Sequence, residues 1–79
     1  MALREAATVF QDPLGITVFD PGHSEEEDRF ITVGTSERGR LLIVAHTERG
    51  ERIRIISARE LTRSEREDYA NEVKKRQQG

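Results

Sequence analysis

The sequence predicts a small α+β domain, in which an antiparallel sheet of about four strands has helices on one face and is followed by a C-terminal helix. Three observations support this prediction. Four short stretches rich in β-branched and aromatic residues succeed one another between turn signals. Two of the connections carry a glycine where a β-hairpin needs one. Segments with helical spacing lie near both ends of the chain, and its 79 residues suffice for a single domain over residues 1–79.

The first elements are a helix, a strand and a loop. The helix covers residues 3–10 and ends before Pro13 and Gly15, which force an exit. Residues 16–20 are β-branched and aromatic and form a short strand. Residues 21–28 form a loop that begins with a Pro-Gly turn and ends with four consecutive acidic residues.

Three further strands cover residues 29–34, 40–47 and 51–58. The second of these is apolar nearly throughout, which predicts a central strand covered on both sides over much of its length. The connections "SERGR" and "TERGE" each have glycine in the third place of a three-residue loop, where a left-handed residue closes a type I turn with a bulge. Ser36 should therefore face Arg40, and Thr47 should face Glu51.

This register divides the strand residues between two faces of the sheet. A mixed face collects Phe30, Thr32, Gly34, Leu42, Val44, His46, Arg52, Arg54 and Ile56. The other face collects Ile31, Val33, Thr35, Leu41, Ile43, Ala45, Ile53 and Ile55. We expect the second face to be the core face on which the helices pack, because it is apolar along most of its length.

The last segment predicts a helix that begins with a capping box, in which Thr62 is the N-cap and Glu65 lies three residues on. Acidic residues follow in its first turns and basic residues lie in its last turn, as the helix dipole favours. Its apolar stripe is thin. We expect this helix to dock weakly, or to leave part of its surface for a partner.

Composition limits the function classes. The chain has no cysteine, no signal peptide pattern and no apolar run long enough to span a membrane, so we expect a soluble cytoplasmic protein. Residues 1–28 carry a net charge of −6 and residues 29–79 a net charge of +4, and eleven of the thirteen basic residues are arginine. An arginine-rich second half favours an anionic ligand, although a bias toward arginine codons explains the same ratio.

Several kinds of catalytic site are disfavoured. His23 and His46 lie on different elements without cysteine or a helical histidine pair, so we expect neither a metal nor a cofactor. The turns with a single glycine do not form a phosphate-binding loop, and no serine lies in a strand-to-helix elbow. The acidic run at residues 25–28 is better explained as a solvated loop than as a cation site.

The mixed face is the remaining candidate. On it His46, Arg52 and Arg54 can meet, with Arg59 at the end of the strand. A ribonuclease without a metal must stabilise charge on the scissile phosphate and transfer protons to and from the reacting oxygens, and arginine and histidine supply these functions. The alternative is structural: the arginines pair with acids across the strands or lie in solvent, and His46 fills the sheet edge.

Two runs of the chain, "EAATVFQDP" and "HSEEEDRFITVGTSERGRLLIVAHTERGERIRIISARELTRSEREDY", resemble the BrnT family, the toxin half of a bacterial type II toxin–antitoxin pair. The most specific part is "RIRIISAR". The resemblance implies a RelE-like ribonuclease that cleaves RNA without a metal and inhibits translation. It also implies a BrnA-type antitoxin as partner, which neutralises the toxin and binds the operator DNA, so that the toxin meets this DNA only indirectly.

Family members usually begin with a strand that carries a Trp-Asp pair and a helix that ends in Lys-His-Gly. This chain begins at what resembles the second helix, so we expect a shortened domain that lacks the family's N-terminal strand and helix. That departure favours an exposed sheet edge or a homodimer. It also leaves two alternatives to a ribonuclease: a non-catalytic remnant that binds only the antitoxin or itself, and a domain that binds RNA without cutting it.

The resemblance also selects candidate site residues. It implies Arg54, Arg59 and Arg29, with His46 at a position where relatives often carry an aromatic residue or histidine. We assign phosphate and transition-state contacts to Arg54 and Arg59 and proton transfer to His46. Arg52 and Arg29 are the predicted substrate-binding residues. Arg52 is selected because it lies on the mixed face. Arg29 falls on the expected core face, which favours a structural ion pair.

Overall fold

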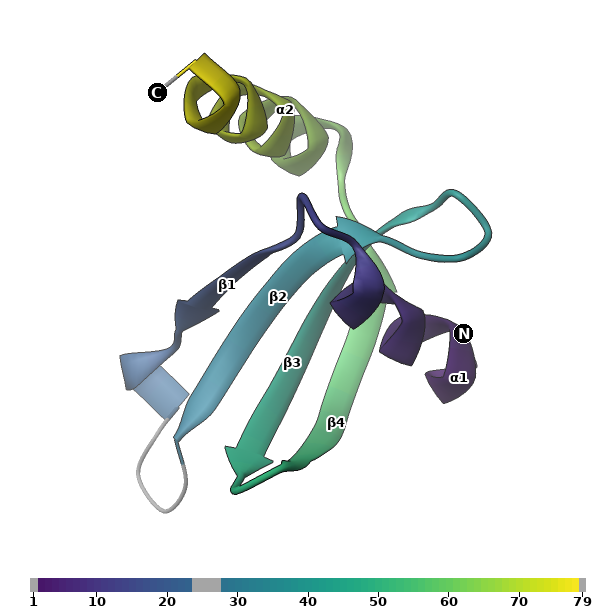
Figure 1. Cartoon of the computed structure of the whole chain (residues 1–79), viewed down its shortest axis with the longest axis vertical. Helices are drawn as coiled ribbons and strands as arrows, with labels where there is room; N and C mark the ends of the chain where they lie inside the picture. Colours follow the sequence, from purple (N-terminus) through teal and green to yellow (C-terminus); the bar gives the residue numbers. More distant parts are fainter. Residues whose placement is uncertain (1, 24–27, 79) are drawn as a thin grey trace.

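The computed structural model describes residues 2–23 and 28–78, so most of the acidic run at residues 25–28 lies outside the described residues. The helices are α1 (Leu3–Thr8) and α2 (Arg63–Gln78), with short 3-10 turns η1 (Val9–Gln11) and η2 (Pro21–His23). The strands are β1 (Ile16–Phe19), β2 (Arg29–Thr35), β3 (Leu41–Arg49) and β4 (Arg52–Glu60). They form an antiparallel sheet in the order β1-β2-β3-β4 (Figure 1). The predicted α+β class is confirmed.

The hairpin between β2 and β3 has the predicted register. The backbone N–H of Ser36 donates to the carbonyl oxygen of Arg40 at 2.8 Å, and the N–H of Gly39 donates to the carbonyl oxygen of Ser36 at 2.9 Å. Gly39 has a φ of +78°, the left-handed conformation that this loop requires. Phe30 consequently lies opposite His46.

The hairpin between β3 and β4 differs from the predicted one. β3 continues to Arg49, which pairs with Arg52, so Gly50 and Glu51 form a two-residue turn. Gly50 has a φ of +58° in the first position of this turn, the place that glycine takes in type II′ turns. The prediction that Thr47 faces Glu51 is therefore wrong. It assumed a three-residue loop by analogy with the first hairpin, whereas a two-residue turn matches the twist of the strands well.

A β-bulge in β4 changes which residues share a face. Ala45 pairs with Ser57 and His46 pairs with Ile55, which leaves Ile56 as the extra residue. Side chains alternate between the faces on each side of a bulge but not across it. A residue of β4 that precedes the bulge therefore shares a face with those residues after the bulge that lie an odd number of positions later in the chain.

We name the two faces by what lies on them. The covered face carries Phe30, Thr32, Gly34, Leu42, Val44, His46, Ile53, Ile55, Ala58 and Glu60. The open face carries Arg29, Ile31, Val33, Leu41, Ile43, Ala45, Thr47, Arg49, Arg52, Arg54, Ser57 and Arg59. Residues that pair directly across antiparallel strands point to the same side, and this rule assigns the faces.

The hydrophobic core lies on the covered face, where α1 contacts β4 and η1 contacts β2 (Figure 1). Ala6 and Val9 pack against Leu42 and Val44, and all four are fully buried. The prediction that the other face is the core face is wrong. Small residues decide the choice, since a Cβ on Gly34 would lie 3.0 Å from Val9 Cγ1, and only glycine lets η1 approach the sheet this closely.

The C-terminal helix begins with the predicted capping box. The N–H of Thr62 donates to Glu65 Oε1 at 2.9 Å, and the N–H of Glu65 donates to Thr62 Oγ1 at 3.2 Å. α2 lies beyond one end of the sheet, where the Tyr69 hydroxyl donates to the carbonyl oxygen of Leu14 at 3.1 Å (Figure 1). Tyr69 and Val73 are half-buried and most other residues of α2 are exposed, in keeping with its thin apolar stripe.

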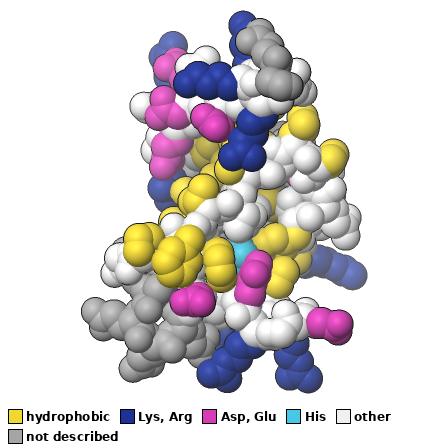
Figure 2. Space-filling model, turned by 60° about the vertical axis from the view of Figure 1, so that its left-hand side comes forward, with side chains coloured by type: hydrophobic (Ala, Val, Ile, Leu, Met, Phe, Trp, Pro, Cys, Tyr) yellow, Lys and Arg dark blue, Asp and Glu magenta, His cyan; other side chains and the backbone are white. Residues whose placement is uncertain are grey.

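The β1 edge of the sheet is apolar. Figure 2 brings this edge forward and shows hydrophobic side chains gathered in the middle of that side of the molecule. Val18 and Phe19 are 51% and 50% exposed, and Phe19 lies edge-to-face against Phe30 with ring centroids 5.6 Å apart. Among the described strands, β1 pairs with β2 alone, so its other edge is open.

Candidate functional site

Three exposed arginines of β4 lie on the open face. Arg52 and Arg54 precede the bulge and Arg59 follows it. In a regular strand Arg54 and Arg59 would point to opposite faces, because they are five residues apart, and the bulge brings them to the same side. Arg29 and Arg49, which have interaction partners of their own, lie on this face as well. The open face therefore concentrates positive charge.

An apolar floor lies beside these arginines. Ile31, Ile43 and Ala45 are half-buried and line a shallow hollow of about 250 Å³, together with Ser57 and Arg59. Guanidinium groups form two-point contacts with phosphate or carboxylate, and the apolar floor accepts less polar parts of a ligand. This arrangement suits a ligand that carries negative charge at intervals.

Arg59 is paired at this site with an acid from the first turn of α2. Its Nη1 donates to Glu65 Oε1 at 2.7 Å and its Nη2 donates to Glu65 Oε2 at 2.9 Å. The hydrogen bond from Arg59, followed by the bond from the backbone of Thr62, lowers the pKa of Glu65 to about 2. The same pair raises the pKa of Arg59. Both groups are therefore charged at neutral pH, and the guanidinium already holds an anion.

His46 lies on the covered face. Its side chain is fully buried, with Nε2 2.7 Å from Thr32 Oγ1 and its ring edge-to-face against Phe10 at a centroid distance of 4.8 Å. Burial lowers the pKa of His46, and the carboxylate of Glu48, 3.8 Å from Nδ1, partly opposes this shift. The ring is therefore favoured in its neutral form.

The prediction that His46 shares a face with Arg52 and Arg54 is wrong. The longer β3 and the bulge place Ile55 opposite His46 and turn both arginines to the other side of the sheet. The structure thus brings Arg52, Arg54 and Arg59 to one face, together with Arg29, and separates His46 from them. The roles assigned to these five residues stay predictions.

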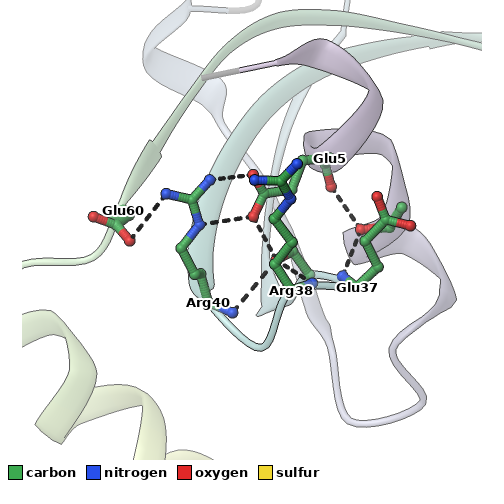
Figure 3. A network of polar contacts seen from close by, with 7 residues as sticks. Glu5, Glu37, Arg38, Arg40 and Glu60 are labelled. Atoms are coloured by element: carbon green, nitrogen blue, oxygen red, sulfur yellow. Dashed lines mark hydrogen bonds and ion pairs between the residues drawn. The ribbon is translucent and has the colours of Figure 1, made fainter.

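An ion pair between the buried Glu5 and the partly exposed Arg40, which sequence reasoning missed, ties α1 to the hairpin between β2 and β3 (Figure 3). Glu5 is only 4% exposed, and Arg40 Nε and Ser36 Oγ donate to its Oε2 at 2.8 and 2.7 Å. Arg40 Nη2 donates to the other carboxylate oxygen, and Arg40 Nη1 lies 3.7 Å from Glu60 Oε1. The hydrogen bonds from Arg40 and then Ser36 lower the pKa of Glu5 to about 2.

No local pattern in the sequence predicts this network. In the sequence Glu5 is an ordinary residue of a short helix and Arg40 is the end of a turn. They lie 35 positions apart, and they meet because α1 packs on the covered face. A buried carboxylate must be paired, so the network holds the helix in one position.

Within residues 2–23 and 28–78, no three His, Cys, Asp or Glu side chains are grouped as a metal ion would need. In the same residues no helix has the length and hydrophobicity that crossing a membrane would take.

A family model described as the ribonuclease toxin BrnT of type II toxin–antitoxin systems matches residues 1–65. The chain belongs to the BrnT family. The match includes the whole sheet and extends to Glu65, so both the arginines of the open face and the partner of Arg59 lie within it. A comparison with curated proteins finds no match.

As a member of the BrnT family, the chain is a toxin of the ribonuclease type, and type II systems imply an antitoxin as its partner. The open face and the network around Glu5 lie in different parts of the molecule and differ in what they can contact. The arginine set of this BrnT chain is accessible to a ligand, whereas Glu5 and Arg40 hold α1 on the sheet and His46 is buried against Phe10.

Proposed function

We propose that this BrnT chain is an endoribonuclease that cleaves RNA without a metal, by a RelE-like mechanism, and so inhibits translation in the cytoplasm. The observation that supports this proposal is the open face, on which Arg52, Arg54 and Arg59 are exposed on one side of a rigid sheet. Arg29 and Arg49 add to the positive charge of that side. RNA carries one negative charge per nucleotide, which this set matches.

The proposed reaction is attack of the RNA 2′-hydroxyl on the adjacent phosphorus, with departure of the 5′-oxygen. Negative charge builds on the phosphate oxygens during this step, and donors fixed in advance lower its barrier. We assign this stabilisation to Arg54 and Arg59, with Arg52 and Arg29 binding the flanking phosphates. A strand of a sheet holds such donors more firmly than a loop does.

Proton transfer is the remaining role in the proposed reaction. His46 remains our proposed proton carrier, but RNA on the open face does not reach its ring, which is fully buried on the other side. Among the described strand residues, the open face carries neither a carboxylate nor an imidazole. This observation favours the second candidate function, a non-catalytic member that binds RNA, an antitoxin or a second copy of itself without cutting RNA.

We further propose that a BrnA-type antitoxin binds the chain and covers its arginines, and that operator DNA is contacted only through this antitoxin. A partner that neutralises the arginine face would need acidic side chains along its contact surface. A homodimer through the open sheet edges is an alternative assembly.

Expression in bacterial cells separates the candidates. We expect expression of the wild-type chain to arrest growth. The purified wild-type chain should cleave RNA in the presence of EDTA. Arg54→Ala should do neither. Arg63→Ala is the matched control, because Arg63 is 89% exposed and belongs to α2 rather than to the sheet. RNA binding without cleavage would support the second candidate, and arrest that persists in Arg54→Ala would remove Arg54 from the mechanism.

A further inference from the structure

The guanidinium of Arg59 already binds an anion, the carboxylate of Glu65, in the two-point geometry with which arginine binds phosphate. Both of its terminal nitrogens donate to Glu65, at 2.7 and 2.9 Å, in a two-point contact. The Nε edge of a guanidinium offers a second pair of donors, the pair that Arg40 uses with Glu5. A phosphate that both terminal nitrogens of Arg59 hold must, however, replace the carboxylate of Glu65.

One member of the pair, Arg59, lines the hollow on the open face. Arg59 is 55% exposed and Glu65 is 36% exposed, and Arg59 lines the hollow with Ser57 and the apolar floor. Ion pairs with this exposure are weak in water, because solvent screens them and ordering two side chains has an entropic cost. A polyanion that also contacts Arg52 and Arg54 on the same face can compete with such a pair.

Glu65 has a second role, in the capping box of α2. Its capping role rests on a hydrogen bond that its Oε1 accepts from the N–H of Thr62, and its own N–H is held by Thr62 Oγ1. Glutamine can fill the same place in a capping box. The charge of Glu65 is therefore not needed to cap the helix, whereas it is what pairs with Arg59.

We infer that Glu65 occupies the place of an RNA phosphate on Arg59, beside the hollow, and that RNA binds by exchanging its phosphate for this carboxylate. The inference rests on the proposed function, since it takes RNA as the ligand of the open face. It adds a residue of α2 to that site. Glu65 acts as an internal competitor, which weakens RNA binding and discriminates against ligands without a strongly charged group.

The test uses a fluorescent single-stranded RNA with 2′-O-methyl groups, which binds but cannot be cleaved through its 2′-oxygen. Glu65→Gln removes the charge and keeps the cap, so we expect it to bind this RNA several-fold more tightly than the wild type. Glu67→Gln is the matched control, because Glu67 is on the same helix, pairs with Arg63 at 3.9 Å and is 70% exposed. It loses the same charge without touching Arg59 and should change the affinity much less.

A double-mutant cycle shows whether the effect passes through Arg59. In Arg59→Ala, the further change Glu65→Gln should no longer raise the affinity. The slope of log K against log salt should also become shallower in Arg59→Ala by about 0.7, the value that one phosphate of a single strand contributes when a cation neutralises it. In the wild type, the ¹³C resonance of the Glu65 carboxylate should shift as RNA is added, a measurement that needs no variant.

Several outcomes would overturn the inference. Unchanged or weaker RNA binding in Glu65→Gln, or an equal gain in Glu67→Gln, would mean that Glu65 does not compete for Arg59. If Arg54→Ala lowers the affinity for RNA and Glu65→Gln leaves it unchanged, this inference is overturned and the proposed function stands. Absence of RNA binding in the wild type and in every variant would overturn both.

Discussion

The two faces of the sheet are built from alternating residues of the same strands, yet they have opposite properties. On β3, Leu42 and Val44 are fully buried under α1, whereas their neighbours Ile43 and Ala45 are half-buried on the open face. On the covered side the carboxylate of Glu5 is held by Arg40 and Ser36, whereas the open face holds exposed arginines. Stability is therefore concentrated on one side, which leaves the other side free to carry the charges that a ligand needs.

The largest difference between the faces should appear when buried methyl groups are removed. We expect Leu42→Ala to lower the free energy of unfolding by about 2–5 kcal/mol, because it leaves a cavity under α1. Ile43→Ala, one residue along on the open face, should lower it by about 1 kcal/mol, since that side chain is already partly in water. Urea denaturation of both variants measures the two values. Equal losses would show that the open face is covered in solution.

The next largest effect should come from the ion pair between Glu5 and Arg40. Because the pKa of Glu5 is about 2 in the folded chain and ordinarily 4.5, the unfolded chain binds a proton more readily between these values. The stabilisation by Glu5 is thus complete above pH 4.5 and is lost as the pH falls toward 2.

We expect Glu5→Gln to have a lower melting temperature than the wild type at pH 7. Its melting temperature should also fall less than that of the wild type as the pH is lowered from 4.5 to 2. Melting temperatures by circular dichroism over this range are the measurement. Glu67→Gln, at an exposed pair, serves as the control. If Glu5→Gln and the wild type had parallel pH profiles, the carboxylate would not be paired in solution.

His46 should give a smaller effect in a different pH range. Burial lowers its pKa below the ordinary value of 6.5, so the unfolded chain takes up a proton below pH 6.5 before the folded chain does. Wild-type stability should therefore fall as the pH drops from 7 to 5. In His46→Gln, which keeps a hydrogen-bonding group toward Thr32, this fall should be reduced. A fall of the same size in the variant would assign it to other groups.

The smallest effect on stability should coincide with the largest effect on RNA. We expect Arg54→Ala to change the free energy of unfolding by no more than about 0.5 kcal/mol, because its side chain is exposed. RNA cleavage should fall by roughly 100-fold or more, the typical loss for one donor to a transition state. Denaturation and a cleavage assay on the same preparation test this separation. A large loss of stability would mean that the open face also supports the fold.

Local patterns in the sequence were sufficient for the elements and for one of the two hairpins. The glycine in "SERGR" predicted the register between β2 and β3, and Thr62 with Glu65 predicted the start of α2. Both features depend on residues within a few positions of one another. The same reasoning failed for "TERGE", because two loop lengths are compatible with that sequence and the choice depends on how β4 packs.

An antiparallel α+β domain with an arginine-rich fourth strand follows from the amino-acid sequence alone. Tertiary structure decided which face α1 covers, because the close approach at Gly34 and the pairing of Glu5 with Arg40 join distant residues. It also decided the bulge at Ile56, which places Arg54 and Arg59 on one side of the sheet and His46 on the other. A shift of one residue reverses every side chain beyond it, and only the packed sheet selects between such registers.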